Sequence, residues 1–164
     1  MEKEDIIEEI VGQKETQEDK FLTFQIGKEE FAIGISHVIE IIGIQKITNL
    51  PNMPSHVKGV INLRGKVIPV IDIRLRFGME ERAYDDRTCI VVVNIDEVSV
   101  GFIVDQVKEV MDILTSNIDP PPSINKGKEN RCVQGLGKVG ESVKIILDVN
   151  KLLFEDELTK YMEA

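Results

Sequence analysis

Tryptophan is absent from the 164-residue chain, and aromatic residues of all kinds make up only 5% of it. The hydrophobic fraction is nevertheless 42%, which is typical of a folded protein and too high for a disordered one. Ile, Val and Leu supply most of it. Because β-branched residues are favoured in strands, a core of this composition favours a fold built mostly of β-sheet.

Cysteine and histidine are also scarce, with two residues of each. Cys89 and Cys132 are too few for a disulfide framework and lack the spacing of metal ligands, which favours reduced, buried thiols in the cytoplasm. His37 and His56 stand in no nucleophile motif and no metal-binding motif. We therefore expect a protein that is not an enzyme, with no catalytic residue, no metal site and no cofactor.

Long apolar runs are missing as well. The longest, such as Ile90–Val93, fall far short of the ~20 residues of a membrane-spanning helix, and the acidic first 20 residues are unlike a signal peptide. With 29 acidic and 20 basic residues, the formal net charge is −9. That balance argues against binding to nucleic acid, or directly to an anionic membrane, because both attract basic proteins.

Residues 1–20 carry eight acidic and three basic side chains, and so contribute more than half of the net charge. Ile6, Ile7, Ile10 and Val11 fall at helical spacing, which fits either a short amphipathic helix or a frayed tail around a nascent one. We expect a flexible acidic tail here, with the folded domain beginning near residue 21.

Short β-like segments separated by turn residues begin at Phe21. Gly27, Gly65 and the pair Asp96-Glu97 stand in loops of hairpin length. The predicted strands are Phe21–Ile26, Glu30–Gly34, Val38–Ile42, Val60–Leu63, Val67–Asp72, Thr88–Ile95, Val98–Val104 and Val143–Val149.

The two halves of the chain resemble one another, which indicates an internal repeat. Residues 22–42 align without a gap on residues 91–111, at an offset of 69, and apolar residues match apolar ones almost throughout. The pattern predicts a duplicated β fold with its insertions in loops. Further matched pairs are Val60 with Val133 and Leu63 with Leu136, at an offset of 73, and Asp72 with Asp148, at an offset of 76.

Each half holds about five short strands, and closing so few strands into a barrel removes the exposed sheet edges. We predict a mostly β protein of two similar five-stranded barrel subdomains with a few short helices. The subdomains would span about residues 21–86 and 87–155, and strand exchange between them is left open. A groove between two packed barrels is a natural place for a partner to bind.

Two patterns invite a chemical interpretation. The run Gly135–Gly140 matches G-x-G-x-x-G, but a strand-like run follows it where a dinucleotide site needs a helix, so we expect a hairpin turn. Asp72, Asp105 and Asp148 each follow an apolar run, where they either cap a following helix or supply carboxylates for acid–base catalysis or Mg²⁺. We favour capping and keep a small carboxylate enzyme as the competing hypothesis.

Prolines mark two further positions. Pro69 lies inside a predicted strand, and because proline cannot donate to a ladder, it predicts an edge strand or a bulge. The run Pro120–Pro122 fits a stiff connector better than an extended left-handed segment displayed for recognition.

Two charged residues stand where the strand pattern does not require them. Arg64 occupies a hairpin tip between apolar strands, and Glu40 interrupts the apolar stretch Val38–Ile42. An arginine and a glutamate can form a bidentate pair that orders a loop or meets a partner. For each residue alone, the alternative is an ordinary solvated surface charge.

Three blocks resemble the chemotaxis coupling protein family, CheW. They are Lys58–Arg74, with the sequence KGVINLRGKVIPVIDIR, the strand Val38–Ile41, and the segment that runs from Gly135 to Asp148. The resemblance covers about residues 20 to 155 in the expected order. The G-x-x-N-L-R-G-x-x-x-P-V-x-D pattern in the first block is the most specific of these signals.

The resemblance implies two five-stranded SH3-like β-barrels over residues 21–155, and we expect a helical tail over residues 156–164. It implies a cytoplasmic scaffold, recruited to membrane receptor arrays through its partners, that links the cytoplasmic tip of methyl-accepting chemoreceptors to the CheW-like regulatory domain of the histidine kinase CheA. The receptor's helical hairpin is expected in the groove between the barrels. The partner-binding residues it suggests are Val38, Glu40, Gly59, Asn62, Leu63 and Arg64.

Overall fold

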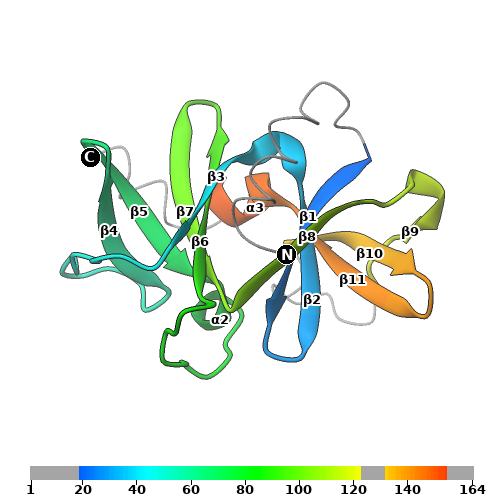
Figure 1. Ribbon diagram of the computed structural model, residues 1–164, viewed down its shortest axis with the longest axis horizontal. Coiled ribbons are helices and arrows are strands. Elements are labelled where there is room, and N and C mark those ends of the chain that lie inside the picture. The colour runs from blue at the N-terminus through cyan, green and yellow to red at the C-terminus, as the bar shows by residue number, and fades with distance from the viewer. Residues whose placement is uncertain (1–18, 123–131, 155–164) are drawn as a thin grey trace.

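The computed structural model describes residues 19–122 and 132–154 (Figure 1). The expected helical tail over residues 156–164, and all but the end of the expected acidic tail, lie outside them. Two short helices, α2 (Ile73–Arg76) and α3 (Val149–Phe154), accompany the strands. The strands are β1 (Lys20–Ile26), β2 (Glu29–Gly34), β3 (Val38–Gly43), β4 (Val57–Leu63), β5 (Lys66–Asp72), β6 (Cys89–Ile95), β7 (Val98–Val104), β8 (Gln106–Asp112), β9 (Ile118–Asp119), β10 (Val133–Val139) and β11 (Ser142–Leu147).

The strands form two sheets, and each sheet closes on itself. One has the order β3-β6-β7-β5-β4, and Thr48, which follows β3, pairs with Val60 of β4. The other has the order β8-β1-β2-β11-β10-β9, and β9 follows β8 in the chain. We call them the first and the second barrel; they lie side by side, on the left and right of Figure 1. The prediction of a mostly β fold with two small barrels is thus confirmed.

In sequence, each repeat consists of a leading hairpin, a single strand, a second hairpin and a short helix. In the structure, the leading hairpin of each repeat belongs to the barrel that the rest of the other repeat forms. The hairpin β1–β2 belongs to the second barrel, where β2 runs parallel to β11. The hairpin β6–β7 belongs to the first barrel, where β7 runs parallel to β5. The sheets therefore do not divide at residues 86 and 87, and the strands are exchanged.

The strand registers give the equivalent positions of the two repeats. Leading hairpins and the strands after them match at an offset of 69, as expected. The hairpins β4–β5 and β10–β11 match at 76 throughout, because Gly59 faces Val70 just as Gly135 faces Ile146. The expected offset of 73 near Val60 is wrong, since the whole insertion lies in the loop before β10. Arg64 therefore corresponds to Gly140 and not to Gly137.

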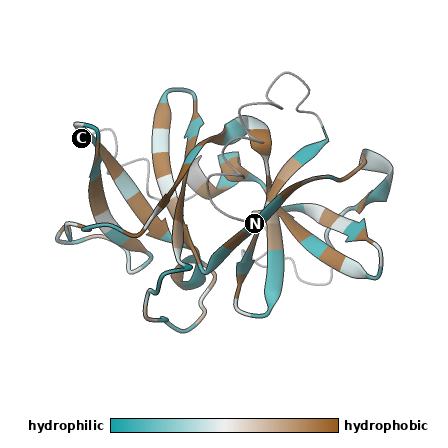
Figure 2. Cartoon of the chain, in the orientation of Figure 1, coloured by the Kyte–Doolittle hydropathy of each residue, from teal (hydrophilic) through white to brown (hydrophobic). Residues whose placement is uncertain are grey.

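Three groups of apolar side chains hold the fold together, and apolar residues concentrate on the strands while the hairpin tips are polar (Figure 2). The largest group lies between the barrels and draws on both sheets, so a packed core fills this space. The buried members inside the first barrel are Ile61, Ile68, Val70, Ile90, Val92 and Ile103, and those inside the second are Phe21, Ala32, Ile113 and Ile146.

Pro69 does not mark an edge strand, because β5 lies between β4 and β7. The parallel ladder to β7 begins only at Val70, so Pro69 precedes it and no donor is lost from that ladder. Cys89 and Cys132 are both buried, as expected. Within the two described stretches, no helix has the length and apolar character needed to cross a membrane.

Candidate functional site

The tip of the hairpin β4–β5 is a two-residue turn held by the side chain of Asn62. The backbone N–H of Gly65 donates to Asn62 Oδ1 over 2.8 Å. Arg64 and Gly65 both have positive φ angles, 51° and 84°, as tight hairpin turns require. The hydrogen-bonded turn thus fixes the backbone position from which the Arg64 side chain extends.

Arg64 and Glu40 form the bidentate pair that their residue types suggest. Arg64 Nη1 donates to Glu40 Oε1 over 3.0 Å, and Nη2 donates to Oε2. The Arg64 side chain remains 69% exposed, whereas that of Glu40 is 19% exposed. The hydrogen bonds from Arg64 hold the pKa of Glu40 below its usual value, so the carboxylate stays ionised at neutral pH.

A bulge explains how Glu40 fits an otherwise apolar strand. On β3, Val38 faces Val93 and Glu40 faces Val92, so Ile39 is the extra residue that β6 does not match. Ile39 is 43% exposed. The extra residue shifts the alternation of side chains along β3, so Glu40 points toward Arg64 across the junction where the first barrel closes. The pair thus connects β3 with the tip of β4–β5.

The remaining predicted site residues lie beneath this surface. Gly59 is buried with a φ of 145°, and a Cβ there would lie 2.0 Å from the carbonyl oxygen of Thr48. Val38 is 1% exposed within the core between the barrels, and Leu63 packs against the interior of the first barrel. Glu40, Asn62 and Arg64 thus gather at the tip, whereas Val38 and Gly59 position the strands that carry it.

Sequence reasoning missed Val67, whose 66% exposure is large for an apolar residue. It follows Lys66, which donates to Ser99 Oγ on β7 over 3.1 Å. No sequence signal separates Val67 from the buried residues of β5, because it belongs to an apolar run. Its position beside the turn adds an apolar contact point to the charged tip.

The tip of the second barrel has the same backbone but different chemistry. Gly140 replaces Arg64, with a φ of 60°, and Glu109 stands at the position equivalent to Glu40. Val143 is equivalent to Val67 and is also exposed, at 48%. The charged pair is therefore confined to the first barrel, although the apolar point is present on both.

Comparison with known proteins places this arrangement in a family. A family described as the CheW-like domain matches residues 20–157. The chain belongs to the CheW-like family. It is 38% identical to a chemotaxis protein CheW of Klebsiella aerogenes over 88% of this chain and 87% of that protein. Identity to the chemotaxis protein CheW of Helicobacter pylori is 36%, over 84% and 82% of the two chains.

A solved structure supports the same assignment. The crystal structure of the scaffolding protein TtCheW from Thermoanaerobacter tengcongensis matches with a TM-score of 0.77 and 34% sequence identity. The match covers 83% of this chain and 92% of that one. The relatives that match this chain are thus named as chemotaxis and scaffolding proteins.

The three carboxylates that raised the enzyme hypothesis have separate structural partners. Asp72 Oδ1 accepts from the N–H of Leu75 and caps α2, and Asp148 Oδ1 accepts from the N–H of Lys151 and caps α3. Asp105 caps no helix, contrary to expectation. Asp148 follows β11 of the second barrel, whereas Asp72 is the last residue of β5 in the first, so the three do not form one carboxylate site.

Asp105 instead fastens three segments together. Its carboxylate accepts hydrogen bonds from Arg74 of α2, from Arg82 before β6, and from the N–H of Gly27 at the tip of β1–β2. Burial raises the pKa of Asp105, but the hydrogen bonds from Arg74 and Gly27 and the nearby arginine charges outweigh it. The net pKa lies below the usual 3.8.

Asp105→Asn is expected to lower the free energy of unfolding by about 2 kcal/mol at pH 7, since it leaves Arg74, only 16% exposed, without its charge partner. A depressed pKa stabilises the fold above the unfolded-state value and loses that effect as pH falls through the folded value. The difference from the parent protein, measured by urea unfolding, should therefore shrink below about pH 4. A difference that stays constant down to pH 3 would contradict the ionic role.

Proposed function

We propose that this chain is a non-enzymatic cytoplasmic scaffold that couples methyl-accepting chemoreceptors to the histidine kinase CheA and so allows receptors to control kinase activity. Membership of the CheW-like family and the names of its relatives support the chemotaxis role. The observation that carries the proposal is the exposed Arg64, held by Glu40 on a rigid turn. Arginine is enriched among the hot-spot residues that contribute most of the binding energy at interfaces. A guanidinium that is exposed and held in place is therefore suited to contact a partner.

The six residues suggested by the family blocks then divide by role. Asn62, Arg64 and the partly exposed Glu40 offer the polar contacts, and Leu63 supports them from below. Val38 and Gly59, both buried, act by positioning β3 and β4. Exposed Val67 joins the contact surface as an apolar neighbour of the tip.

The direct test mixes the purified protein with chemoreceptor-containing membranes, with CheA, and with both. We expect it to pellet with the membranes, to bind CheA in their absence, and to make kinase activity depend on the receptor ligand. Failure to bind either partner at micromolar concentration would refute the scaffold. Binding to both without any effect on kinase activity would refute the coupling role.

A further inference from the structure

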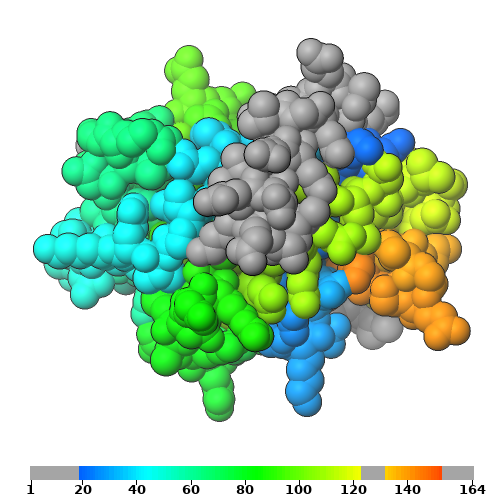
Figure 3. Space-filling model, viewed as in Figure 1, coloured from blue at the N-terminus to red at the C-terminus, as the bar shows by residue number. Residues whose placement is uncertain are grey.

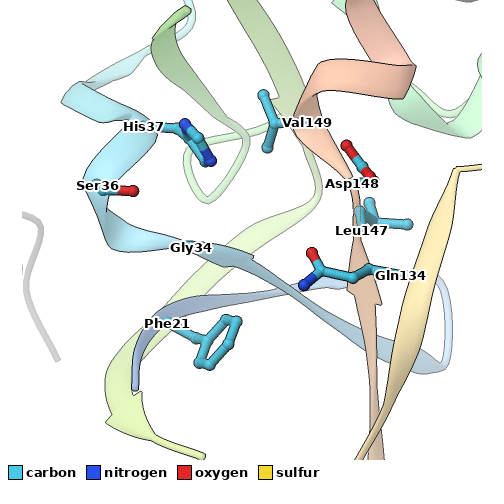
Figure 4. Close-up of a pocket in the computed structure, with 8 residues that line it drawn as sticks. All are labelled: Phe21, Gly34, Ser36, His37, Gln134, Leu147, Asp148 and Val149. Atoms are coloured by element: carbon cyan, nitrogen blue, oxygen red, sulfur yellow. The ribbon is translucent and has the colours of Figure 1, made fainter. Parts of the chain in front are cut away.

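The second barrel has an open pocket where it meets α3 (Figure 4). The cavity measures about 280 Å³, which is close to the lower limit of small-molecule sites and suits a single side chain. The His37 ring and the Gln134 amide project toward it from opposite sides. The lining residues are Phe21, Gly34, Ser36, His37, Gln134, Leu147, Asp148 and Val149.

The internal repeat identifies the equivalent place in the first barrel. Two of the lining residues face one another across the hairpin β1–β2, and their counterparts face one another across β6–β7 at the offset of 69. Two others come from β10 and from the end of β11, and their counterparts lie at the offset of 76. The matched pairs are Phe21 with Ile90, Gly34 with Ile103, Gln134 with Lys58, and Asp148 with Asp72.

In the first barrel, Tyr84 fills this place. Its hydroxyl donates to Asp72 Oδ2 over 2.8 Å, and its ring lies beneath the Lys58 ammonium, 5.9 Å from the ring centroid. The ring also packs against the apolar group to which Ile90 and Ile103 belong. Tyr84 stands on the connection between α2 and β6, beside the tip of β1–β2 in the lower part of Figure 3. All four counterparts of the pocket residues thus surround one tyrosine side chain.

The second barrel has the receiving groups without the ring. Asp72 uses both carboxylate oxygens, one to cap α2 and the other to accept from Tyr84. Asp148 Oδ1 caps α3 by accepting from the N–H of Lys151 over 3.1 Å, whereas Oδ2 accepts no hydrogen bond from the residues that the structure describes. Gly34 adds room because it has no side chain. Among the described residues, no aromatic ring stands at the place equivalent to Tyr84.

We propose that this pocket receives a tyrosine side chain of a partner protein, whose hydroxyl donates to Asp148 Oδ2 and whose ring lies against Phe21. The carboxylate suits a hydroxyl donor, and the apolar floor suits a ring. The volume accepts one side chain and leaves the rest of a larger molecule outside, as for a residue that a protein presents. None of the lining residues belongs to the tip that carries Arg64, so this site is additional to that one.

Amide ¹H–¹⁵N spectra test the chemistry of the pocket with 4-methylphenol, which is the tyrosine side chain without its backbone. We expect the amides of Ser36, Gln134 and Asp148 to shift, with a dissociation constant on the order of 1 mM. Toluene should bind about fivefold or more weakly, because it offers no donor to the carboxylate. Tighter binding of propylamine than of 4-methylphenol would assign the pocket to a cation and overturn the proposal.

Matched variants show where the phenol binds. Gly34→Ile gives the second barrel the side chain that the first has at this position, and it should weaken binding of 4-methylphenol at least about tenfold. The backbone suits it, since Gly34 has φ −60° and ψ 133° and a Cβ there meets no atom closer than 3.6 Å. Ser116→Ile adds the same side chain at an exposed position of the second barrel and is the control. Tyr84→Ala empties the equivalent place, so 4-methylphenol should then also shift the amide of Asp72.

Partner binding decides whether a protein supplies the tyrosine, and this step rests on the proposed function. CheA and chemoreceptor membranes are assayed separately with the parent protein, Gly34→Ile and Ser116→Ile. Gly34→Ile should weaken binding to one of them by about fivefold or more. Saturating 4-methylphenol should weaken the same binding in the parent protein and in Ser116→Ile, but no further in Gly34→Ile.

Three results would overturn the proposal: no binding of 4-methylphenol, binding that appears only after residues 155–164 are removed, or unchanged affinity of Gly34→Ile for both partners. The second of these would show that the chain covers its own pocket. A parent protein that binds neither partner would refute the scaffold together with this inference. Absence of phenol binding in a protein that binds both partners would refute the inference alone.

Discussion

Gly59→Ala is expected to lower the free energy of unfolding by about 4 kcal/mol or more, a large part of the stability of an ordinary domain. The new Cβ would lie 2.0 Å from the carbonyl oxygen of Thr48, and the φ of 145° is one that side chains rarely adopt. Thr48 has little freedom to move away. Its N–H and carbonyl form the two hydrogen bonds to Val60, of 2.8 and 2.9 Å, that close the first barrel.

Urea unfolding of Gly59→Ala beside Gly65→Ala separates crowding from backbone strain. Gly65 also has a positive φ, 84°, but a Cβ there meets nothing within 4 Å. Its substitution should therefore lower stability by only about 1 kcal/mol. Equal losses in the two variants would show that the conformation of the glycine matters and the contact with Thr48 does not.

The local features of this fold follow from the sequence because they depend on neighbouring residues. Gly27 and Gly65 mark the turns of two hairpins. The helix caps at Asp72 and Asp148 follow from a carboxylate placed before a short helix. The repeat was also visible, since buried positions on equivalent strands keep their apolar character. Each of these inferences needs only residues that lie close together in the chain.

The exchange of leading hairpins between the barrels could not be predicted in this way. The hairpins β1–β2 and β6–β7 have equivalent patterns of apolar residues on their buried faces. The alternation of apolar and polar residues therefore allows either hairpin to pair in either barrel. The same degeneracy caused the incorrect offset at Val60, because Val and Leu recur at several spacings. The choice depends on the long-range packing of the core between the barrels.

The candidate site also combines residues that local sequence predicts with residues whose role depends on long-range packing. The pair of Glu40 and Arg64 was predictable because Glu40 interrupts an apolar strand and Arg64 places a charge at a hairpin tip between apolar strands. The burial of Val38 and Gly59 was not, since it depends on a bulge in β3 and on the approach of Thr48. A family block thus contains residues that meet a partner together with residues that only shape the surface.

Arg64→Ala is expected to weaken binding to at least one partner by about tenfold or more, as truncation of an arginine anchor commonly does. The side chain is exposed, so the loss should appear in binding while the melting temperature stays close to that of the parent protein. Glu40 reports the broken pair independently. Without the hydrogen bonds from Arg64, its pKa should rise toward the usual value, which carboxyl NMR titration measures.

A charge exchange distinguishes a contacting Arg64 from one that only orders the tip. In the double variant Arg64→Glu with Glu40→Arg, an ion pair can form again but the exposed group is now acidic. If Arg64 contacts the partner, the double variant binds as weakly as Arg64→Ala; if pairing alone matters, binding returns. Lys138→Ala, which removes a half-exposed cation on the second barrel, is the matched control for net charge. Because CheA and receptor membranes are assayed separately, the partner whose affinity fails to return is the one that the guanidinium meets.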